Sequence, residues 1–430
     1  MLYEKSTNYN KFFFLISSLI FYSFAFEILW NAQSEPCQND TKTRINFTNY
    51  IIKTNKNYTF RGDKIVLLYE GNIGLYPHLK NHTNGTIEYI NKGLPQLVNM
   101  TEHLKKLEEN INNIIKDVNF SGLVIIDIEE WRPTYDSNWS SKRIYRNQSI
   151  ELVLNTTNIT DTKEAEKIAI EQFDKAAINF FNKTLHKCKE LRKNAKWGFY
   201  GFPTCNENAE NRNWSFCFPN ISDKTIPIFK YVDAMYPAPY IVQGQNYSIK
   251  NLFVQAVLNE TQRIVDKIYK EENKNKSIYV YQKIEVDPFT EILKDIEFYD
   301  PYYLCIGYKN LVSYNVDGII VWTTSKNMSD RCLYIKNYTE SVFGPYIKNL
   351  KKNFLISSQT TIFPTTISQT TLSSRQTGSL TTNTFSLNDC NQLLTEENIK
   401  KWCETNFYGP NCKQSKLNSS GLLTTTPSPS

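Results

Sequence analysis

Residues 122–133 read Gly-Leu-Val-Ile-Ile-Asp-Ile-Glu-Glu-Trp-Arg-Pro, and this stretch decides how the rest of the chain is interpreted. The continuous apolar run from Gly122 to Ile126 is typical of a strand that is buried on both faces. Successive side chains of a strand point to opposite faces, so Asp127 and Glu129 would share one face directly after the run. The stretch therefore predicts two carboxyl groups at the carboxyl end of a buried strand.

Two carboxyl groups in one small site favour acid–base chemistry. Like charges at close range cannot both ionise cheaply, so one carboxyl keeps its proton near neutral pH and becomes a candidate general acid. The same residues also fit a solvated acidic strand end that is neutralised by Arg132, because structural ion pairs perturb such groups too. Spacing alone leaves both interpretations open.

The flanking segments alternate between helical and strand patterns. Apolar residues recur at helical spacing over 101–118, from Leu104 to Val118. Asp161-x-x-Glu164 fits a capping box that opens a helix to about Leu191. A strand-like segment, a second helical segment and two more strand-like segments follow, at 196–200, 252–270, 277–282 and 318–322. This alternation predicts an α/β protein with a parallel sheet under helices, and a barrel is its commonest closed form.

Composition and charge narrow the class of protein. The chain has 430 residues, of which 40% are hydrophobic and 14% aromatic, which is too apolar for a disordered protein. Its net charge of +6 comes from basic and acidic residues interspersed along the chain. No basic block is present that could follow a nucleic acid backbone, so we expect no nucleic acid partner. A polyanionic substrate is compatible with this charge.

The first 25 residues have the features of a signal peptide. Lys5 and Lys11 precede an apolar run over 12–26, which includes the cleavage-like Ser23-Phe24-Ala25. A signal anchor is the alternative, but roughly 15 apolar residues fall short of the ~20 that span a bilayer. We therefore expect secretion, with a lysosomal location as the alternative, and no stable membrane insertion after cleavage. Many Asn-x-Ser/Thr sequons agree with secretion, among them those at Asn46, Asn57, Asn81 and Asn119.

The composition changes after about Asn353 and divides the chain. We expect a signal peptide at 1–25, a barrel domain at 26–353 and a Ser/Thr-rich linker at 354–387. A small cysteine-containing fragment would follow at 388–413, and a disordered tail at 414–430.

The stretch 122–133 closely resembles the hyaluronidase family of glycoside hydrolases, which includes bee-venom, sperm and lysosomal enzymes. Other segments resemble the family in the same order, so the resemblance covers about residues 27 to 350. These segments are Leu29-Trp30-Asn31, Phe60-Arg61-Gly62, Gly74-Leu-Tyr-Pro77, Gly93-Leu-Pro-Gln96, Trp197-Gly-Phe-Tyr-Gly-Phe-Pro203, Tyr236-Pro-x-x-Tyr240 and Gly318-x-x-x-Trp322.

The resemblance implies a distorted (β/α) barrel that hydrolyses β-1,4 bonds after N-acetylhexosamine in hyaluronan, and often in chondroitin. Glu129 matches the family's acid, which protonates the glycosidic oxygen while the substrate's own acetamido carbonyl attacks the anomeric carbon. Asp127 matches its partner, which helps to position the acetamido group. Tyr200 and Tyr240 match tyrosines that orient this group, and Trp322 matches the aromatic wall of the −1 sugar.

Further residues are assigned by the same resemblance. Tyr69 and Asp287 would line the groove, and Arg132 would brace the carboxyls. Ile128 stands where the family has Trp, and its side chain should face away from the site, so we expect only a packing change.

The resemblance also implies two disulfides, Cys37–Cys332 and Cys205–Cys217. Two further cysteines, Cys188 and Cys305, have no family counterpart; they form either a mutual bridge or two buried free thiols. Three more resemble the end of an epidermal-growth-factor-like (EGF-like) module, of which only a fragment is present: Cys390, Cys403 and Cys412.

Together these features predict a secreted, monomeric endo-β-N-acetylhexosaminidase acting on hyaluronan or chondroitin, with no metal and no cofactor. Two alternatives stay open: a hydrolase that prefers chondroitin, and a catalytically silent glycosaminoglycan-binding protein on the same barrel.

Overall fold

The computed structural model describes residues 26–207, 216–241, 247–289, 296–314 and 316–360, and all structural statements below concern these residues. The expected signal peptide, the EGF-like fragment with its three cysteines and the tail lie outside them, as does most of the Ser/Thr-rich linker.

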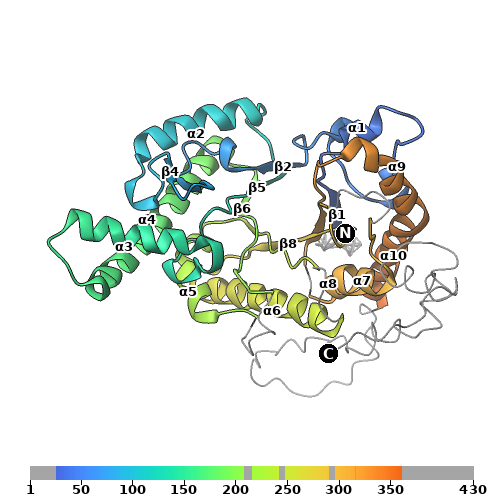
Figure 1. The fold of residues 1–430 in the computed structure, drawn as a ribbon. Helices are drawn as coiled ribbons and strands as arrows, with labels where there is room; N and C mark the ends of the chain where they lie inside the picture. Colours follow the sequence, from blue (N-terminus) through green and yellow to red (C-terminus); the bar gives the residue numbers. More distant parts are fainter. Residues whose placement is uncertain (1–25, 208–215, 242–246, 290–295, 315, 361–430) are drawn as a thin grey trace, which may run out of the picture.

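Seven short parallel strands form the centre of the fold and are surrounded by helices (Figure 1). The strands are β1 (Glu27–Trp30), β2 (Ile65–Leu68), β5 (Leu123–Ile126), β6 (Lys196–Phe199), β7 (Ala234–Met235), β8 (Ser277–Gln282) and β9 (Gly318–Val321). They pair in the orders β2-β5-β6 and β7-β8-β9-β1, and a parallel bridge between Tyr200 and Tyr236 joins β6 to β7. This is the expected α/β fold, a distorted TIM-like barrel.

The helices cover the outside of the strands. Their bounds are α1 (Glu35–Gln38), α2 (Met100–Ile114), α3 (Arg143–Thr156), α4 (Thr162–Leu191), α5 (Pro219–Phe229), α6 (Tyr247–Glu272), α7 (Pro301–Leu304), α8 (Asn310–Ser313), α9 (Met328–Tyr338) and α10 (Gly344–Thr360). A small antiparallel hairpin, β3 (His78–Asn81) with β4 (Ile87–Ile90), lies outside the barrel strands. As predicted, the Asp161 side chain caps α4 by accepting from the Glu164 N–H at 2.8 Å.

The predicted helix over 101–118 is too long at its end. α2 ends at Ile114, and Val118 is 62% exposed instead of packing on the helix's apolar face. The cause is a turn at Asp117, whose carboxylate accepts from the Asn119 N–H and whose carbonyl accepts from the Phe120 N–H. An Asx turn of this kind competes with helical hydrogen bonding, and the chain leaves the helix.

Side-chain alternation along the strands separates two cores. The inner core fills the barrel, and along β5 it takes Leu123 and Ile125. The outer core lies between strands and helices and takes Val124, Ile126 and Ile128. Ile128 therefore packs away from the barrel interior, as its place between the two carboxyls predicted. The inner core consists of Leu29, Phe60, Ile65, Leu67, Leu123, Ile125, Ala234, Tyr236, Tyr279, Tyr281 and Ile320.

Both disulfides implied by the resemblance are present. Cys37–Cys332 joins α1 to α9 across 295 residues of sequence, and Cys205–Cys217 closes a short loop after β6.

Both alternatives for Cys188 and Cys305 are wrong. Cys188 is a free thiol, buried on the inner side of α4. Cys305 is in a disulfide, so the two cysteines neither pair with each other nor are both free.

Candidate active site

The candidate active site lies at the carboxyl ends of the barrel strands, where Asp127 and Glu129 follow β5. Both continue the alternation of Leu123 and Ile125, so the strand directs them to the barrel interior. The Asp127 N–H donates to the Leu68 carbonyl at 2.8 Å, which extends the pairing with β2 by one residue. Asp127 is 7% exposed, and its Oδ1 has no hydrogen-bond partner among the described residues.

Glu129 is exposed to solvent, unlike Asp127, and a second carboxylate lies against its backbone. Its N–H donates to Oε1 of Glu70, from the turn after β2, at 2.9 Å. Burial raises the pKa of Asp127, and the charges of Glu129 and Glu70 raise it further. The pKa of Glu129 is also raised, mainly by desolvation within the surrounding protein, with Glu70 adding to the effect. Burial, with repulsion between neighbouring carboxylates adding to it, keeps a proton on this carboxyl pair at neutral pH.

Two cations, Lys142 and Arg132, partly oppose the rise in the pKa of Glu129. The Lys142 ammonium, which donates to the Glu129 and Glu130 carbonyls, lowers the pKa of the Glu129 carboxyl, and Arg132 lowers it less. The Arg132 guanidinium lies over the Trp139 ring, 4.5 Å from its centroid, and donates to the Ser137 carbonyl at 2.7 Å. Arg132 therefore holds its own loop and acts on Glu129 through charge.

An aromatic wall stands beside the carboxyl pair. Tyr200 and Tyr240 lie next to each other, with ring centroids 6.4 Å apart. Trp322 stacks on Tyr240, with ring centroids 6.1 Å apart, and lies close to Tyr69. Asp127 and Glu129 raise the pKa of all three tyrosines, although burial is the largest cause in each case. The two carboxyls and this wall thus form one site.

Asp287 lies on the loop after β8, apart from the carboxyl pair. It accepts a hydrogen bond from the Phe289 N–H at 2.9 Å, and the Phe289 ring lies 6.3 Å from Trp322. The structure thus brings six of the predicted site residues together, whereas Asp287 lies further out, beside Phe289 and near the Lys283 ammonium that lies over the Tyr240 ring. These six are Asp127, Glu129, Tyr69, Tyr200, Tyr240 and Trp322.

Three residues of the site escaped the sequence analysis. Tyr281 meets Tyr200 edge to face at 5.1 Å, and the alternation along β8 could have identified it. Glu70 follows Tyr69 at the carboxyl end of β2, which pairs with β5, so the strand pattern held a weak signal for it. Lys142 reaches the site through backbone carbonyls, for which the sequence has no signal.

Two features are absent from the described residues. None of their helices is long and apolar enough to cross a bilayer. They also contain no group of three or more His, Cys, Asp or Glu side chains placed to hold a metal ion.

Parallel strands that carry a carboxyl pair and an aromatic wall at their carboxyl ends are typical of barrel glycoside hydrolases. Comparison with known proteins gives the family. Residues 17–388 match the family model described as hyaluronidase. The chain is 32% identical over 335 residues to hyaluronidase A of Vespula vulgaris, covering 76% of this chain and 96% of the relative. It is 30% identical over 333 residues to a chondroitin hydrolase of Caenorhabditis elegans, covering 76% and 70% respectively.

A solved structure is similar over the same region. Bee venom hyaluronidase in complex with a hyaluronic acid tetramer superimposes with a TM-score of 0.68 at 26% identity, covering 76% of this chain and 99% of the other. The chain belongs to the hyaluronidase family of glycoside hydrolases.

Proposed function

We propose that this protein is an endo-β-N-acetylhexosaminidase that hydrolyses the β-1,4 bonds of hyaluronan, chondroitin or both. The observation that carries the proposal is the Asp127–Glu129 pair, which retains a proton beside an aromatic wall at the open end of the barrel. The family supports it, and so do relatives named for hyaluronan and for chondroitin.

The mechanism uses one protein acid and a nucleophile from the substrate. Glu129 gives its proton to the glycosidic oxygen as the bond to the anomeric carbon breaks. The acetamido carbonyl oxygen of the same sugar attacks that carbon and forms a cyclic intermediate. Water then opens the ring and gives its proton to the Glu129 carboxylate, which restores the acid. Asp127 holds the acetamido N–H while the carbonyl attacks.

The aromatic wall would orient the sugar. The hydroxyls of Tyr200 and Tyr240 lie next to the carboxyl pair and donate to the acetamido group. The face of Trp322 packs on the −1 ring. Tyr69 extends the groove beside Trp322, and Asp287 lines it further out. Arg132 braces the acidic loop without touching the substrate.

The test is release of reducing ends from hyaluronan and from unsulfated chondroitin by the glycosylated, secreted protein, from about pH 4 to about pH 7. Turnover of either polymer supports the proposal, and the ratio of kcat/KM identifies the preferred one. Preference for chondroitin would match the Caenorhabditis elegans relative's name. Binding of both polymers without turnover by the folded protein would contradict the proposal and leave a glycan-binding barrel.

The proposal extends to secretion, to the monomeric state and to the segments on either side of the barrel. Cleavage after Ala25 would release a secreted monomer in which a Ser/Thr-rich segment at 354–387 joins the barrel to the small cysteine-containing fragment. Amino-terminal sequencing of the secreted protein should give Phe26 as its first residue, and light scattering should give the monomer mass. A different first residue or a larger mass would contradict these two points.

A further inference from the structure

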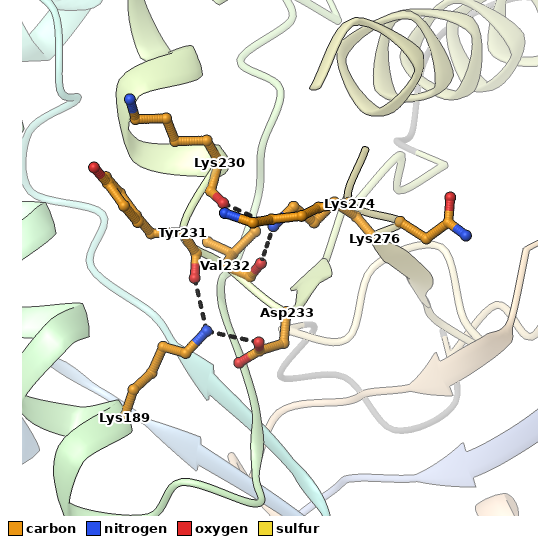
Figure 2. Close-up of a pocket in the computed structure, with 8 residues that line it drawn as sticks. Lys189, Lys230, Tyr231, Val232, Asp233, Lys274 and Lys276 are labelled. Atoms are coloured by element: carbon orange, nitrogen blue, oxygen red, sulfur yellow. Dashed lines mark hydrogen bonds and ion pairs between the residues drawn. The ribbon is translucent and has the colours of Figure 1, made fainter. Parts of the chain in front are cut away.

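A lysine-rich pocket lies at the end of the barrel opposite the candidate active site. Its lining comes from segments that precede strands: the end of α4, the turn before β7 and the turn before β8. In a barrel of parallel strands these amino ends face away from the carboxyl ends that hold Asp127 and Glu129. The pocket has a volume of about 400 Å³. It is lined by Lys189, Lys230, Tyr231, Val232, Asp233, Lys274, Asn275 and Lys276 (Figure 2).

The ammonium groups of Lys189 and Lys276 are fixed by the backbone. Lys189 donates to the Tyr231 carbonyl at 2.9 Å and to Asp233 at 2.6 Å, as the dashed lines in Figure 2 show. Lys276 donates to the carbonyls of Lys230 and Val232 at 2.8 and 2.6 Å. An ammonium carries three N–H donors, so each of these lysines keeps one donor beyond its contacts with described residues.

Positive charge exceeds negative charge around the pocket. Lys189 pairs with Asp233, whereas Lys230 and Lys274 both lie against the same carboxylate, Glu272, at 3.9 and 2.9 Å. Lys276 has backbone carbonyls as its hydrogen-bond partners. Four lysines thus face two carboxylates, and an anion in the pocket would balance the excess.

The charge state of Lys276 agrees with this imbalance. The pKa of Lys276 is lowered to about 8, mainly by burial; the charges of Lys189 and Lys274 add to this lowering, and those of Asp233 and Glu272 oppose it. A bound anion would favour the charged ammonium and raise this pKa. Binding near pH 8 should therefore take up protons.

We propose that this pocket is a second binding site for a glycosaminoglycan chain, which it holds by carboxylate or sulfate groups while the active-site groove holds another part of the same polymer. That the ligand is a glycosaminoglycan rests on the proposed function, whereas its being an anion follows from the excess of lysines around the pocket. A long polymer can reach around the barrel to both ends, so the second site raises its effective concentration at the groove. A hexasaccharide held in the groove is too short to do so.

The test compares Lys230→Gln/Lys274→Gln with wild type. Lys274 is exposed and Lys230 partly exposed; both form ion pairs with Glu272, and Lys230 also lies over the Tyr231 ring at 5.1 Å, so the fold should tolerate the change. Lys64→Gln/Lys106→Gln is the matched control, because these two exposed lysines also pair with single carboxylates and the net charge changes equally. Asn275 begins an Asn-Lys-Ser sequon at the rim, so each protein is also made with Asn275→Gln to remove any glycan there.

For long hyaluronan and chondroitin sulfate we expect the pocket variant to bind about fivefold more weakly, with a smaller dependence on salt. The KM of the pocket variant for the polymer should rise. Its kcat and its KM for a hexasaccharide substrate should both stay unchanged. The control variant should match wild type on both substrates. Weaker binding of both polymers identifies carboxylate as the bound group, and weaker binding of chondroitin sulfate alone identifies sulfate. Polymer affinity equal to that of wild type would overturn the proposal, even if inorganic sulfate binds the pocket.

Binding and turnover separate this proposal from the proposed function. Affinity for the polymer is measured without cleavage. A protein without catalytic activity would therefore still reveal whether the second site binds the polymer. Calorimetry at about pH 8 in two buffers of different ionisation enthalpy should show proton uptake that Lys276→Gln abolishes. Binding without proton uptake in wild type would contradict the assigned role of Lys276.

Discussion

The backbone N–H of Glu129 donates to Oε1 of Glu70 at 2.9 Å, so a carboxylate from the turn after β2 lies against the proposed catalytic acid. Glu70 thereby places a third carboxyl group near Asp127 and Glu129. The pairing of β2 with β5 brings the three carboxyls together, because both strands end at the same edge of the barrel.

Replacing Glu70 with Gln should lower the pKa of Glu129, because a charge that opposes its ionisation is lost. A general acid must be protonated, so activity falls as pH rises through its pKa. We expect the alkaline limb of the kcat/KM profile to move to lower pH in Glu70→Gln. In Lys142→Gln it should move to higher pH, because Lys142 lowers the same pKa. Shifts in one direction for both variants would contradict this account.

Removing the hydroxyl of Tyr240 should weaken catalysis more than stability. Tyr240→Phe keeps the stack with Trp322 but loses the proposed hydrogen bond to the acetamido group. We expect kcat/KM to fall by about ten- to a hundredfold, the range for a lost hydrogen bond that forms in the transition state. Tyr279→Phe, at the amino end of the inner core, is the control and should leave kcat/KM unchanged.

His103 should make the fold sensitive to acid. It is fully buried, with Nδ1 accepting from the Leu75 N–H and Nε2 next to the Thr184 hydroxyl, and burial lowers its pKa to about 4. The folded state therefore favours the neutral ring. This stabilisation is complete above the unfolded pKa of about 6.5 and is lost as pH falls towards 4. The stability lost over this range is about 3 kcal/mol.

The pH dependence of chemical unfolding measures this effect. Wild type should lose stability between about pH 6.5 and 4 more steeply than His103→Gln, whereas the exposed His186→Gln should follow wild type. An NMR titration that gives His103 a pKa near 6.5 would refute the assignment.

The two disulfides should differ in their contribution to stability. Cys37–Cys332 closes a loop of 295 residues and Cys205–Cys217 one of 12. Loop-closure entropy predicts a loss of about 6 kcal/mol on replacing the first pair with alanines and about 3 kcal/mol for the second. Denaturant unfolding of the two double variants, each compared with wild type, measures both values. A larger loss for the short loop would show that local packing dominates over chain entropy.

Much of the architecture could be predicted because it depends on local patterns. β8 begins and ends at the residues that its apolar pattern indicated, and Asp161 caps α4 as its spacing with Glu164 required. Alternation predicted that Asp127 and Glu129 share one face after the buried run, and in the structure they continue the alternation of Leu123 and Ile125. Each of these features depends on residues close together in the sequence.

Features that depend on contacts distant in sequence were missed. Glu70 meets Glu129 across 59 residues, and Lys142 reaches the site through carbonyl oxygens, which have no side-chain signature.

Two local features were also missed. The hairpin β3–β4 has polar, partly exposed strands without the apolar alternation that marks a buried face. Val118 matched the helical period, but the turn at Asp117 prevailed over it.

Glu129 has the proposed role of proton donor. Its most direct test is Glu129→Gln, which is nearly isosteric and cannot donate the proton, compared with Glu130→Gln, the neighbouring exposed carboxylate. Reducing-end release from the preferred polymer should fall by at least about a thousandfold in Glu129→Gln and stay near wild type in Glu130→Gln, while both variants bind the polymer and unfold like wild type. Turnover in Glu129→Gln within about tenfold of wild type would contradict the account.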